Sequence, residues 1–291
     1  MINNSGNKLK YYLELSKLKI MIPVSLTGFT GYFLFNPFLS IRLFLVSFGI
    51  LLLAIAASVL NQMQEIDLDS RMSRTKDRPI PAGKIGIKPA SVFFLINLIS
   101  GAAIIYAAGN LIAMIIGLIT IIWYNGVYTG SKRITSFAVV PGALTGALPP
   151  LIGWVAAGGG IWDKSVIFLE FLLFICQIPH FWLLILKYGE EYKDAGVPSL
   201  TDVFTRLQIK RLTFTWVATS VIAALFLCYF EIIRNGFVIV ILLIASAILI
   251  WQFSELIIKR EVSNKFDKYS IILYLYFMLI LILMIIDRII S

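Results

Sequence analysis

A cluster of amide and charged side chains follows directly after a long apolar run, in the segment 61–83. Asn61, Glu65 and Asp69 are spaced four residues apart, so on a helix they drift only slowly around one face. Charged groups at the end of a membrane helix are costly next to lipid, which makes them a functional-site hypothesis. One amide and two carboxylates, completed by water and substrate phosphates, are oxygen ligands that Mg²⁺ prefers. The spacing predicts a metal held jointly by protein and diphosphate, with Asp67 on a neighbouring face.

Basic side chains crowd the loop that follows these carboxylates, and several such donors in one short loop can bind phosphate oxygens. The alternative is a solvated loop in which Glu65 pairs with Arg71 or Asp69 pairs with Arg74, and the spacing alone leaves both interpretations open. The basic residues are Arg71, Arg74, Lys76 and Arg78, followed by the helix-ending Pro79 and Pro81.

A second polar segment, 128–133, places Lys132 four residues after Tyr128 at a predicted membrane boundary. Lys132 could contact a diphosphate, and Tyr128 could offer its ring face or its hydroxyl to an allylic cation. Tyr and Lys are also common as interfacial anchors, and the spacing by itself favours that simpler explanation.

A third polar segment supplies more carboxylates, at Glu190, Glu191 and Asp194. These could hold a second metal across a diphosphate from the first, or form a surface acidic loop balanced by Lys193. His180 is the only histidine in the chain and precedes this segment by two helical turns. A lone intramembrane histidine is ordinarily a packing residue rather than a ligand.

The elements that must position these residues are membrane helices. The chain has 291 residues, of which 59% are hydrophobic and 14% charged, and its mean hydropathy is +0.89. A helix needs about 20 apolar residues to cross a hydrocarbon core about 30 Å thick. We therefore predict an all-α membrane protein, a bundle of nine transmembrane helices in one polytopic domain spanning residues 1–291. The expected spans are 20–36, 43–63, 91–108, 110–128, 136–157, 165–187, 212–230, 236–256 and 270–288.

The distribution of Lys and Arg predicts the orientation of this bundle. Segments that share one side with the N-terminus, together with Lys187 at the membrane edge, hold all of the 25 basic residues except Arg42, Lys164, Arg234 and Arg288. By the positive-inside rule the N-terminus is cytoplasmic. The polar segments then meet on that face, as active-site loops 64–90, 129–135 and 188–211. The two remaining cytoplasmic segments are the lead-in 1–19 and the loop 257–269.

Composition also argues against other classes of protein. The net charge of +9 is explained by topology and by attraction to anionic lipid or a diphosphate, so we expect no nucleic-acid partner. The polar N-terminus does not have the pattern of a secretory signal peptide. Cys176 and Cys228 both fall inside predicted spans, which argues against a disulfide framework.

Taken together, the three polar segments resemble the UbiA-type intramembrane prenyltransferases. The first resembles an acidic helix end followed by M-x-R-T-x-x-R-P, here 72–79. Segments 128–159, containing GALPPLIGW, and 179–198, beginning PHFW, are similar to the heme O synthase branch of that family. The resemblance covers 15–205 well and the last three helices only by topology. Glu65, Glu190 and Glu191 stand where Asp is usual, and KLKI replaces KPRI at Leu18.

The resemblance implies an activity: farnesyl diphosphate would donate its farnesyl group to a vinyl group of protoheme IX, with Mg²⁺ assisting diphosphate departure. It implies that Asn61, Glu65 and Asp69 hold metal, with Asp67 contacting these ligands, and that Glu190, Glu191 or Asp194 serve a second cluster. His180 becomes a candidate for heme, as axial ligand or hydrogen-bond partner, beside the packing alternative. The diphosphate would be held by Arg74, Lys76, Arg78 and Lys132, with Tyr128 beside the cation.

The same resemblance places the protein in the cell's inner (plasma) membrane, with the lipid bilayer around it and a downstream heme A synthase or oxidase as a possible partner. Three other functions stay open at this stage. The acceptor could be 4-hydroxybenzoate or a naphthoate instead of heme. The chain could be a secondary transporter, although such proteins place binding groups nearer the bilayer midplane. It could also be a heme-binding scaffold, which would have no use for metal and phosphate groups.

Overall fold

The computed structural model describes residues 4–258 and 266–291, and every regular element in these two ranges is helical. Most of the predicted loop 257–269 lies outside the described residues, as does the start of the lead-in 1–19. The main helices are α1 (Asn4–Ser16), α2 (Leu18–Phe35), α3 (Ile41–Gln64), α5 (Ile87–Ala108), α6 (Leu111–Ile122), α10 (Lys164–Asp194), α11 (Arg206–Tyr229), α12 (Gly236–Ile258) and α13 (Phe266–Ile290). The short elements are α4 (Ile66–Arg71), the π-helix η1 (Trp123–Tyr128), α7 (Thr129–Ser131), α8 (Val139–Ala147), α9 (Pro149–Ala156) and the 3-10 turn η2 (Leu200–Asp202).

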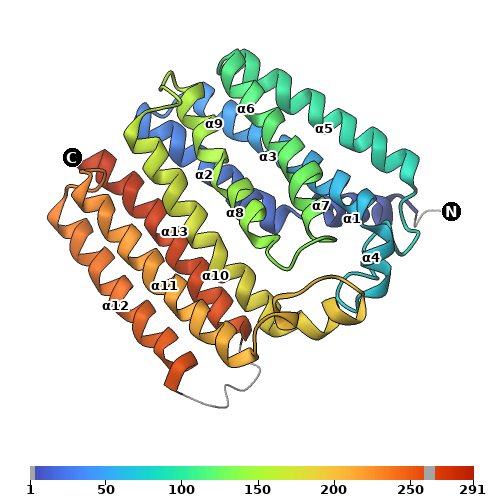
Figure 1. Ribbon diagram of the computed structural model, residues 1–291. Helices are drawn as coiled ribbons and strands as arrows, with labels where there is room; N and C mark the ends of the chain where they lie inside the picture. The colour runs from blue at the N-terminus through green and yellow to red at the C-terminus, as the bar shows by residue number, and fades with distance from the viewer. Residues whose placement is uncertain (1–3, 259–265) are drawn as a thin grey trace.

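Within the described residues, nine helical stretches are long and apolar enough to cross a membrane, and they confirm the predicted bundle. Most of their ends fall within a few residues of the predicted ones, because the hydrocarbon thickness sets how many apolar residues each span needs. The long helices run side by side at moderate tilts, with α5 and α12 on the outside (Figure 1). The protein is therefore a multi-pass membrane protein.

Some helix ends differ from the predicted ones, and a side-chain cap explains the earlier start of α11. Helix α11 begins at Arg206 rather than 212 because Thr205 and Gln208 form a reciprocal capping box. Helix α10 runs on to Asp194 instead of ending near 187, so Glu190, Glu191 and Asp194 lie on a helix and not in the predicted loop. The predicted span 136–157 is two helices, α8 and α9, which meet at Leu148 in front of two prolines.

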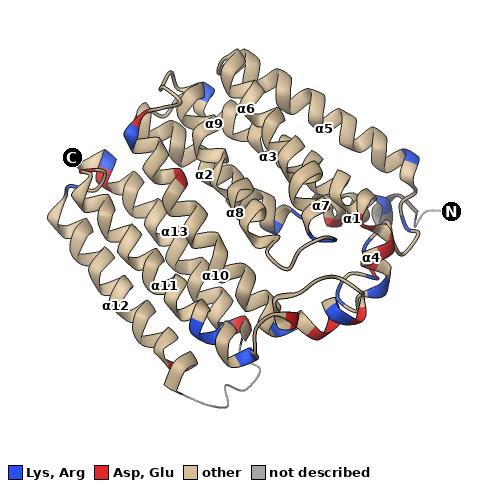
Figure 2. Ribbon diagram, in the orientation of Figure 1, with Lys and Arg blue, Asp and Glu red and all other residues tan. Residues whose placement is uncertain are grey.

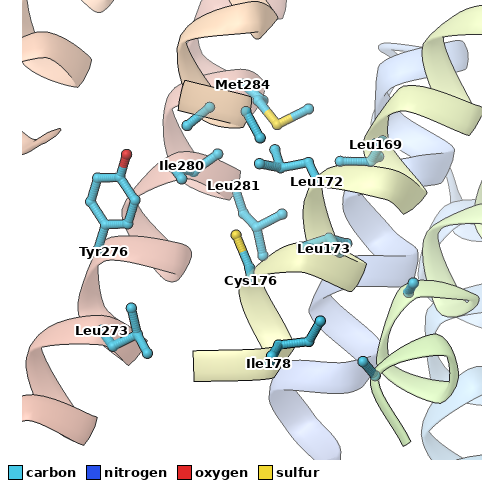
Figure 3. Close-up of a cluster of buried hydrophobic side chains, with 14 of the residues drawn as sticks. Leu169, Leu172, Leu173, Cys176, Ile178, Leu273, Tyr276, Ile280, Leu281 and Met284 are labelled. Carbon is cyan, nitrogen blue, oxygen red and sulfur yellow. The ribbon is translucent and has the colours of Figure 1, made fainter. Parts of the chain in front are cut away.

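Within lipid the hydrophobic effect does not drive helices together, so close van der Waals contact between helices stabilises the bundle. Small residues are therefore important where two helix backbones cross. Gly153 of α9 lies directly against the backbone of Gly28 on α2, and a Cβ at Gly153 would overlap the carbonyl of Gly28. A larger packed cluster joins α10 to α13. There Leu172 and Cys176 meet Leu281 in a layer of apolar side chains (Figure 3). Cys176 is a packing residue in this layer.

Charged side chains gather at one end of the helices, around α4, the end of α10 and the start of α11, with a smaller group at the opposite end (Figure 2). The helical stretches between these two ends carry few charges. This arrangement brings the three polar segments of the sequence to the same end of the bundle. Their placement on the cytoplasmic side stays a prediction from the positive-inside rule.

Candidate active site at the charged end of the bundle

The acidic helix end is bent at Glu65, which separates α3 from α4. Glu65 has φ −106° and ψ 19°, so the chain leaves helical geometry for one residue and resumes at Ile66. The bend keeps Asn61, Glu65 and Asp69 on one side, where all three are buried and line one cavity. Asn61 Nδ2 donates to Glu65 Oε2 at 2.9 Å. The structure thus brings together the three residues whose spacing predicts a metal site.

Each buried carboxylate faces a cation. Lys132 Nζ lies 3.0 Å from Glu65 Oε1, and Arg78 Nη1 lies 2.8 Å and 2.7 Å from the two Asp69 oxygens. The pairs considered from the sequence, Glu65 with Arg71 and Asp69 with Arg74, are not formed. Buried charges of this kind are usually paired in proteins, and each of these two carboxylates has its own cationic partner.

A π-helical turn carries the aromatic residues of the second segment. In η1 the chain widens, and the Thr129 side chain donates to Tyr124 O at 2.9 Å while accepting from Asn61 Nδ2 at 3.1 Å. π-turns inside helices are rare and often occur at functional sites. The turn directs Tyr124 and Tyr128 into the cavity, and Lys132 Nζ lies 4.6 Å from the centroid of the Tyr128 ring.

Lys132 stays charged in this setting. Burial alone would lower the pKa of Lys132, but Tyr128 and Glu65 outweigh it, so its pKa is raised above the ordinary value of 10.5. An ammonium that is held charged beside a cavity, with one carboxylate partner, can transfer its contact to an incoming phosphate.

Lys17 is a cavity residue that the sequence did not single out. It joins α1 to α2 with φ 46° and ψ 43°, a left-handed conformation that is strained for a side chain other than glycine. Burial, together with the positive charge of Arg78, lowers the pKa of Lys17 to about 7. In the sequence Lys17 looks like one of several lysines of an interfacial lead-in, and only its backbone strain and its place in the cavity set it apart.

The cavity extends from this charged end into the apolar interior, with a volume of about 540 Å³. Helices α2, α3, α6, α8, α9, α10 and α13 all contribute to its walls. His180 and Gln177 of α10 line it too; His180 is a predicted site residue, whereas nothing in the sequence distinguishes Gln177 from other polar residues. Apolar residues that line the inner part include Ile50, Leu53, Ile121, Ile152, Met278 and Leu281.

The third segment reaches the first through two hydrogen bonds, one of them between residues that line the cavity. Ser73 Oγ donates to Glu191 Oε1 at 2.8 Å, and Arg74 Nη2 donates to the Tyr192 hydroxyl at 3.5 Å. Arg74 and Tyr192 line the cavity. Glu191 Oε2 is buried and has no hydrogen-bond partner among the described residues.

Several predicted site residues do not line this cavity. Asp67, Lys76 and Asp194 are exposed to solvent, and Glu190 lines a smaller hollow beside Arg206. Glu191 is not among the residues that line the cavity either, although it lies next to Tyr192, which does. In the part of the chain that the structure describes, no three His, Cys, Asp or Glu side chains converge as a metal cage. The six predicted metal ligands therefore do not form one preformed cluster, and the group that faces the cavity is Asn61, Glu65 and Asp69.

Comparison with known proteins decides the family. The profile of the UbiA prenyltransferase family matches residues 24–283. The chain belongs to the UbiA prenyltransferase family. Within it, the chain is 32% identical over 290 residues to a protoheme IX farnesyltransferase from Legionella pneumophila (strain Paris), covering 95% of this chain and 94% of the relative. It is 34% identical over 236 residues to one from Nitratidesulfovibrio vulgaris (strain DP4), covering 81% and 82%.

Solved UbiA-type structures share the fold. A digeranylgeranylglyceryl phosphate synthase superposes with a TM-score of 0.76 at 24% identity, covering 98% of this chain and 99% of that one. A UbiA homolog from Archaeoglobus fulgidus, bound to DMAPP and Mg²⁺, superposes with a TM-score of 0.67 at 17% identity, covering 94% and 98%. The resemblance predicted from three polar segments is confirmed, and this UbiA family member is a multi-pass membrane enzyme that transfers prenyl groups.

Proposed function

We propose that this enzyme transfers the farnesyl group of farnesyl diphosphate to a vinyl group of protoheme IX. The observation that carries the proposal is the shape of the cavity, which joins a cationic end to an apolar interior. A diphosphate matches the first part, and an isoprenoid chain beside a flat macrocycle matches the second. Relatives that match most of the chain are protoheme IX farnesyltransferases, which favours heme over other acceptors.

The residues at the charged end fit Mg²⁺. Asn61 Nδ2 donates to both Glu65 and Thr129, which leaves Asn61 Oδ1 as its coordinating atom. With Glu65 and Asp69 this makes three oxygen donors, and Mg²⁺ is commonly completed by water and substrate phosphates. The Archaeoglobus homolog binds DMAPP and Mg²⁺ on the same fold. When bound, Mg²⁺ would neutralise charge on the departing diphosphate.

The second acidic group would contribute through Glu191. Its Oε2 atom is buried and unpaired, while its Oε1 atom is tied to Ser73 of the first segment. A buried acceptor without a partner is costly, so a metal ion or a metal-bound water is a suitable occupant. Glu190 and Asp194 are less suited to this role because they face the smaller hollow and solvent.

The cations of the site would bind the diphosphate. Lys132 and Arg78 are already directed at the metal-binding carboxylates, and Arg74 and Lys17 line the same cavity. Electrostatic stabilisation of the leaving group is the largest single contribution in many such reactions. As the bond from C1 of farnesyl to oxygen breaks, the ring faces of Tyr124 and Tyr128 would stabilise positive charge at C1.

The vinyl group of heme would then attack C1 with its terminal carbon. The new carbon–carbon bond leaves a cation on the vinyl carbon next to the porphyrin, and water adds there to give the hydroxyl of heme O. The site would lie at the cytoplasmic face of the inner (plasma) membrane, as the basic residues predict. The product is apolar, so a heme A synthase or oxidase in the same membrane is a suitable recipient.

The proposal is tested with membranes that contain the protein, incubated with farnesyl diphosphate, Mg²⁺ and protoheme. Mass spectrometry of the extracted heme should show the farnesylated hydroxyethyl product, and omission of Mg²⁺ should abolish it. Parallel incubations replace heme by 4-hydroxybenzoate or by a dihydroxynaphthoate. Prenylation of either one without any farnesylated heme would reassign the acceptor.

A further inference from the structure

Two polar side chains of α10 face the cavity at membrane depth. Gln177 and His180 are one helical turn apart, and both line the cavity. Both are half-buried, and none of the described residues forms a hydrogen bond with either side chain. An amide and an imidazole surrounded by apolar groups need hydrogen-bond partners, since leaving them unpaired is costly. Their polar groups are therefore available to a molecule in the cavity.

Helix α8 shows where this pair lies relative to the charged end. Gly142 faces Tyr128, and a Cβ there would lie 2.6 Å from the Tyr128 ring. Gly146, one turn further along α8, faces Gln177, and its Cβ would lie 2.8 Å from Gln177 Nε2. Gln177 is thus placed one helical turn beyond Tyr128 along the cavity wall.

His180 is connected to the same place through aromatic rings. Its centroid lies 6.2 Å from that of Phe181, which lies 6.1 Å from that of Tyr128. At the other end of this row of rings, the Lys132 ammonium lies over the Tyr128 ring, next to Glu65. The order along the wall is therefore cation, aromatic rings, then the uncharged polar pair.

We propose that Gln177 and His180 hold the water molecule that ends the reaction, with His180 accepting its proton. The inference rests on the proposed function, because it concerns the cation formed when heme attacks C1 of farnesyl. Water oxygen forms a bond to the vinyl carbon next to the porphyrin, and one O–H bond breaks. The proton passes to the imidazole nitrogen of His180 and from there to solvent. Gln177 accepts from and donates to the same water, which fixes its position.

The placement of the pair favours water over an anionic part of the substrate. A heme propionate requires cations, and the cations that line the cavity are grouped at its charged end. Gln177 and His180 are instead beyond the Tyr128 ring, beside the place where carbon chemistry occurs. Imidazole is also the side chain that most often acts as a general acid or base, directly or through one water.

The test compares products of Gln177→Leu and His180→Phe with those of the unaltered protein. Membranes with farnesyl diphosphate, Mg²⁺ and protoheme are incubated, and mass spectrometry gives the ratio of hydroxylated to dehydrated farnesyl heme. The dehydrated product, lighter by one water, forms when the cation loses a proton instead. We expect this ratio to fall by about tenfold or more in both variants, while KM for protoheme is unchanged. Gln252→Leu, which removes an amide from α12 away from the cavity, is the matched control.

Different results would overturn the inference and the proposed function separately. An unchanged ratio with a raised KM for protoheme, or a changed absorption spectrum of bound heme in His180→Phe, would assign the pair to acceptor binding. Complete loss of farnesylated heme in a folded variant would also overturn it, since water enters after the carbon–carbon bond forms. Gln177→Asn, which keeps the amide on a shorter side chain, should shift the ratio partway if the larger changes impair folding. Absence of farnesylated heme with the unaltered protein would instead refute the proposed function.

Discussion

Lys132 Nζ lies 3.0 Å and 3.2 Å from the two carboxylate oxygens of Glu65. This buried ion pair joins the bend between α3 and α4 to the residue that follows α7, elements separated by more than sixty positions of sequence. The same ammonium lies over the Tyr128 ring. One contact therefore couples the metal-binding acid, the diphosphate-binding cation and the aromatic wall.

Substitutions at Glu65 and Lys132 should affect the stability and the activity of the protein differently. Lys132→Met leaves the Glu65 carboxylate buried and unpaired, and we expect a loss of stability on the order of 3 kcal/mol, together with loss of turnover. The double variant Glu65→Gln with Lys132→Met should regain most of the stability, because no buried charge remains, but no activity. Thermal unfolding in detergent and a turnover assay measure the two effects. A double variant with wild-type turnover would remove both residues from the reaction.

The contact between Arg78 and Asp69 predicts that a positive charge at position 78 is not sufficient for full activity. Arg78 Nη1 contacts both oxygens of Asp69, and a lysine would keep the charge but lose the planar guanidinium. We expect Arg78→Lys to lower kcat/KM for farnesyl diphosphate by about tenfold. Lys84→Met, at an exposed lysine of the same loop, is the control and should change it less than twofold or so. Equal effects of the two variants would contradict a specific role.

Lys17 predicts a pH dependence of diphosphate binding. Its pKa of about 7 means that the free enzyme loses this positive charge as the pH rises through 7. Binding of an anion above that pH then requires proton uptake, so KM for farnesyl diphosphate should rise by at most about tenfold per pH unit. Lys17→Met should remove the part of this pH dependence of KM that comes from Lys17. The part that comes from ionisation of farnesyl diphosphate should remain. Identical pH profiles for the two proteins would show that Lys17 does not contact diphosphate.

The same lowered pKa has a consequence for stability. The folded-state pKa is below the ordinary value of 10.5, so charged Lys17 destabilises the fold in full below about pH 7. The destabilisation is relieved as the pH rises from about 7 to 10.5. Lys17→Met should therefore stabilise the protein more at pH 6 or so than at about pH 9, as measured by thermal unfolding. A gain that is larger at high pH would have the wrong sign for this account.

The close approach of Gly142 to the Tyr128 ring allows a test of how precisely that ring must be positioned. A Cβ at Gly142 would lie 2.6 Å from the Tyr128 ring, so Gly142→Ala must displace that ring. Small displacements of groups around a reacting centre can cost up to about a hundredfold in rate, and we expect a decrease of about tenfold in kcat. Gly126→Ala in the preceding turn meets no atom within 4 Å and is the matched control. Similar rates for both variants would show that the ring position does not matter.

Much of this protein could be predicted from sequence because two requirements act locally. Lipid demands about 20 apolar residues for each span, so the nine runs were recognisable by length. The four-residue spacing of Asn61, Glu65 and Asp69 placed them on one side, and this survived the bend at Glu65 because the bend removes only one residue from the helix. The family was predicted correctly from three segments, 61–83, 128–159 and 179–198, each of which is continuous in the chain.

The tertiary structure decided which distant residues meet. Glu65 pairs with Lys132 and not with Arg71, since electrostatic attraction acts through space and the fold brings a different cation nearer. The roles proposed for Lys17 and Gln177 depend on a cavity that helices from most of the chain enclose, and no short stretch of sequence encodes it. Helix ends at Arg206 and Asp194 were set by side-chain caps and by continued packing, which compete with simple hydropathy. Local chemistry thus determined the elements and the reacting groups, while contacts across the fold determined their partners.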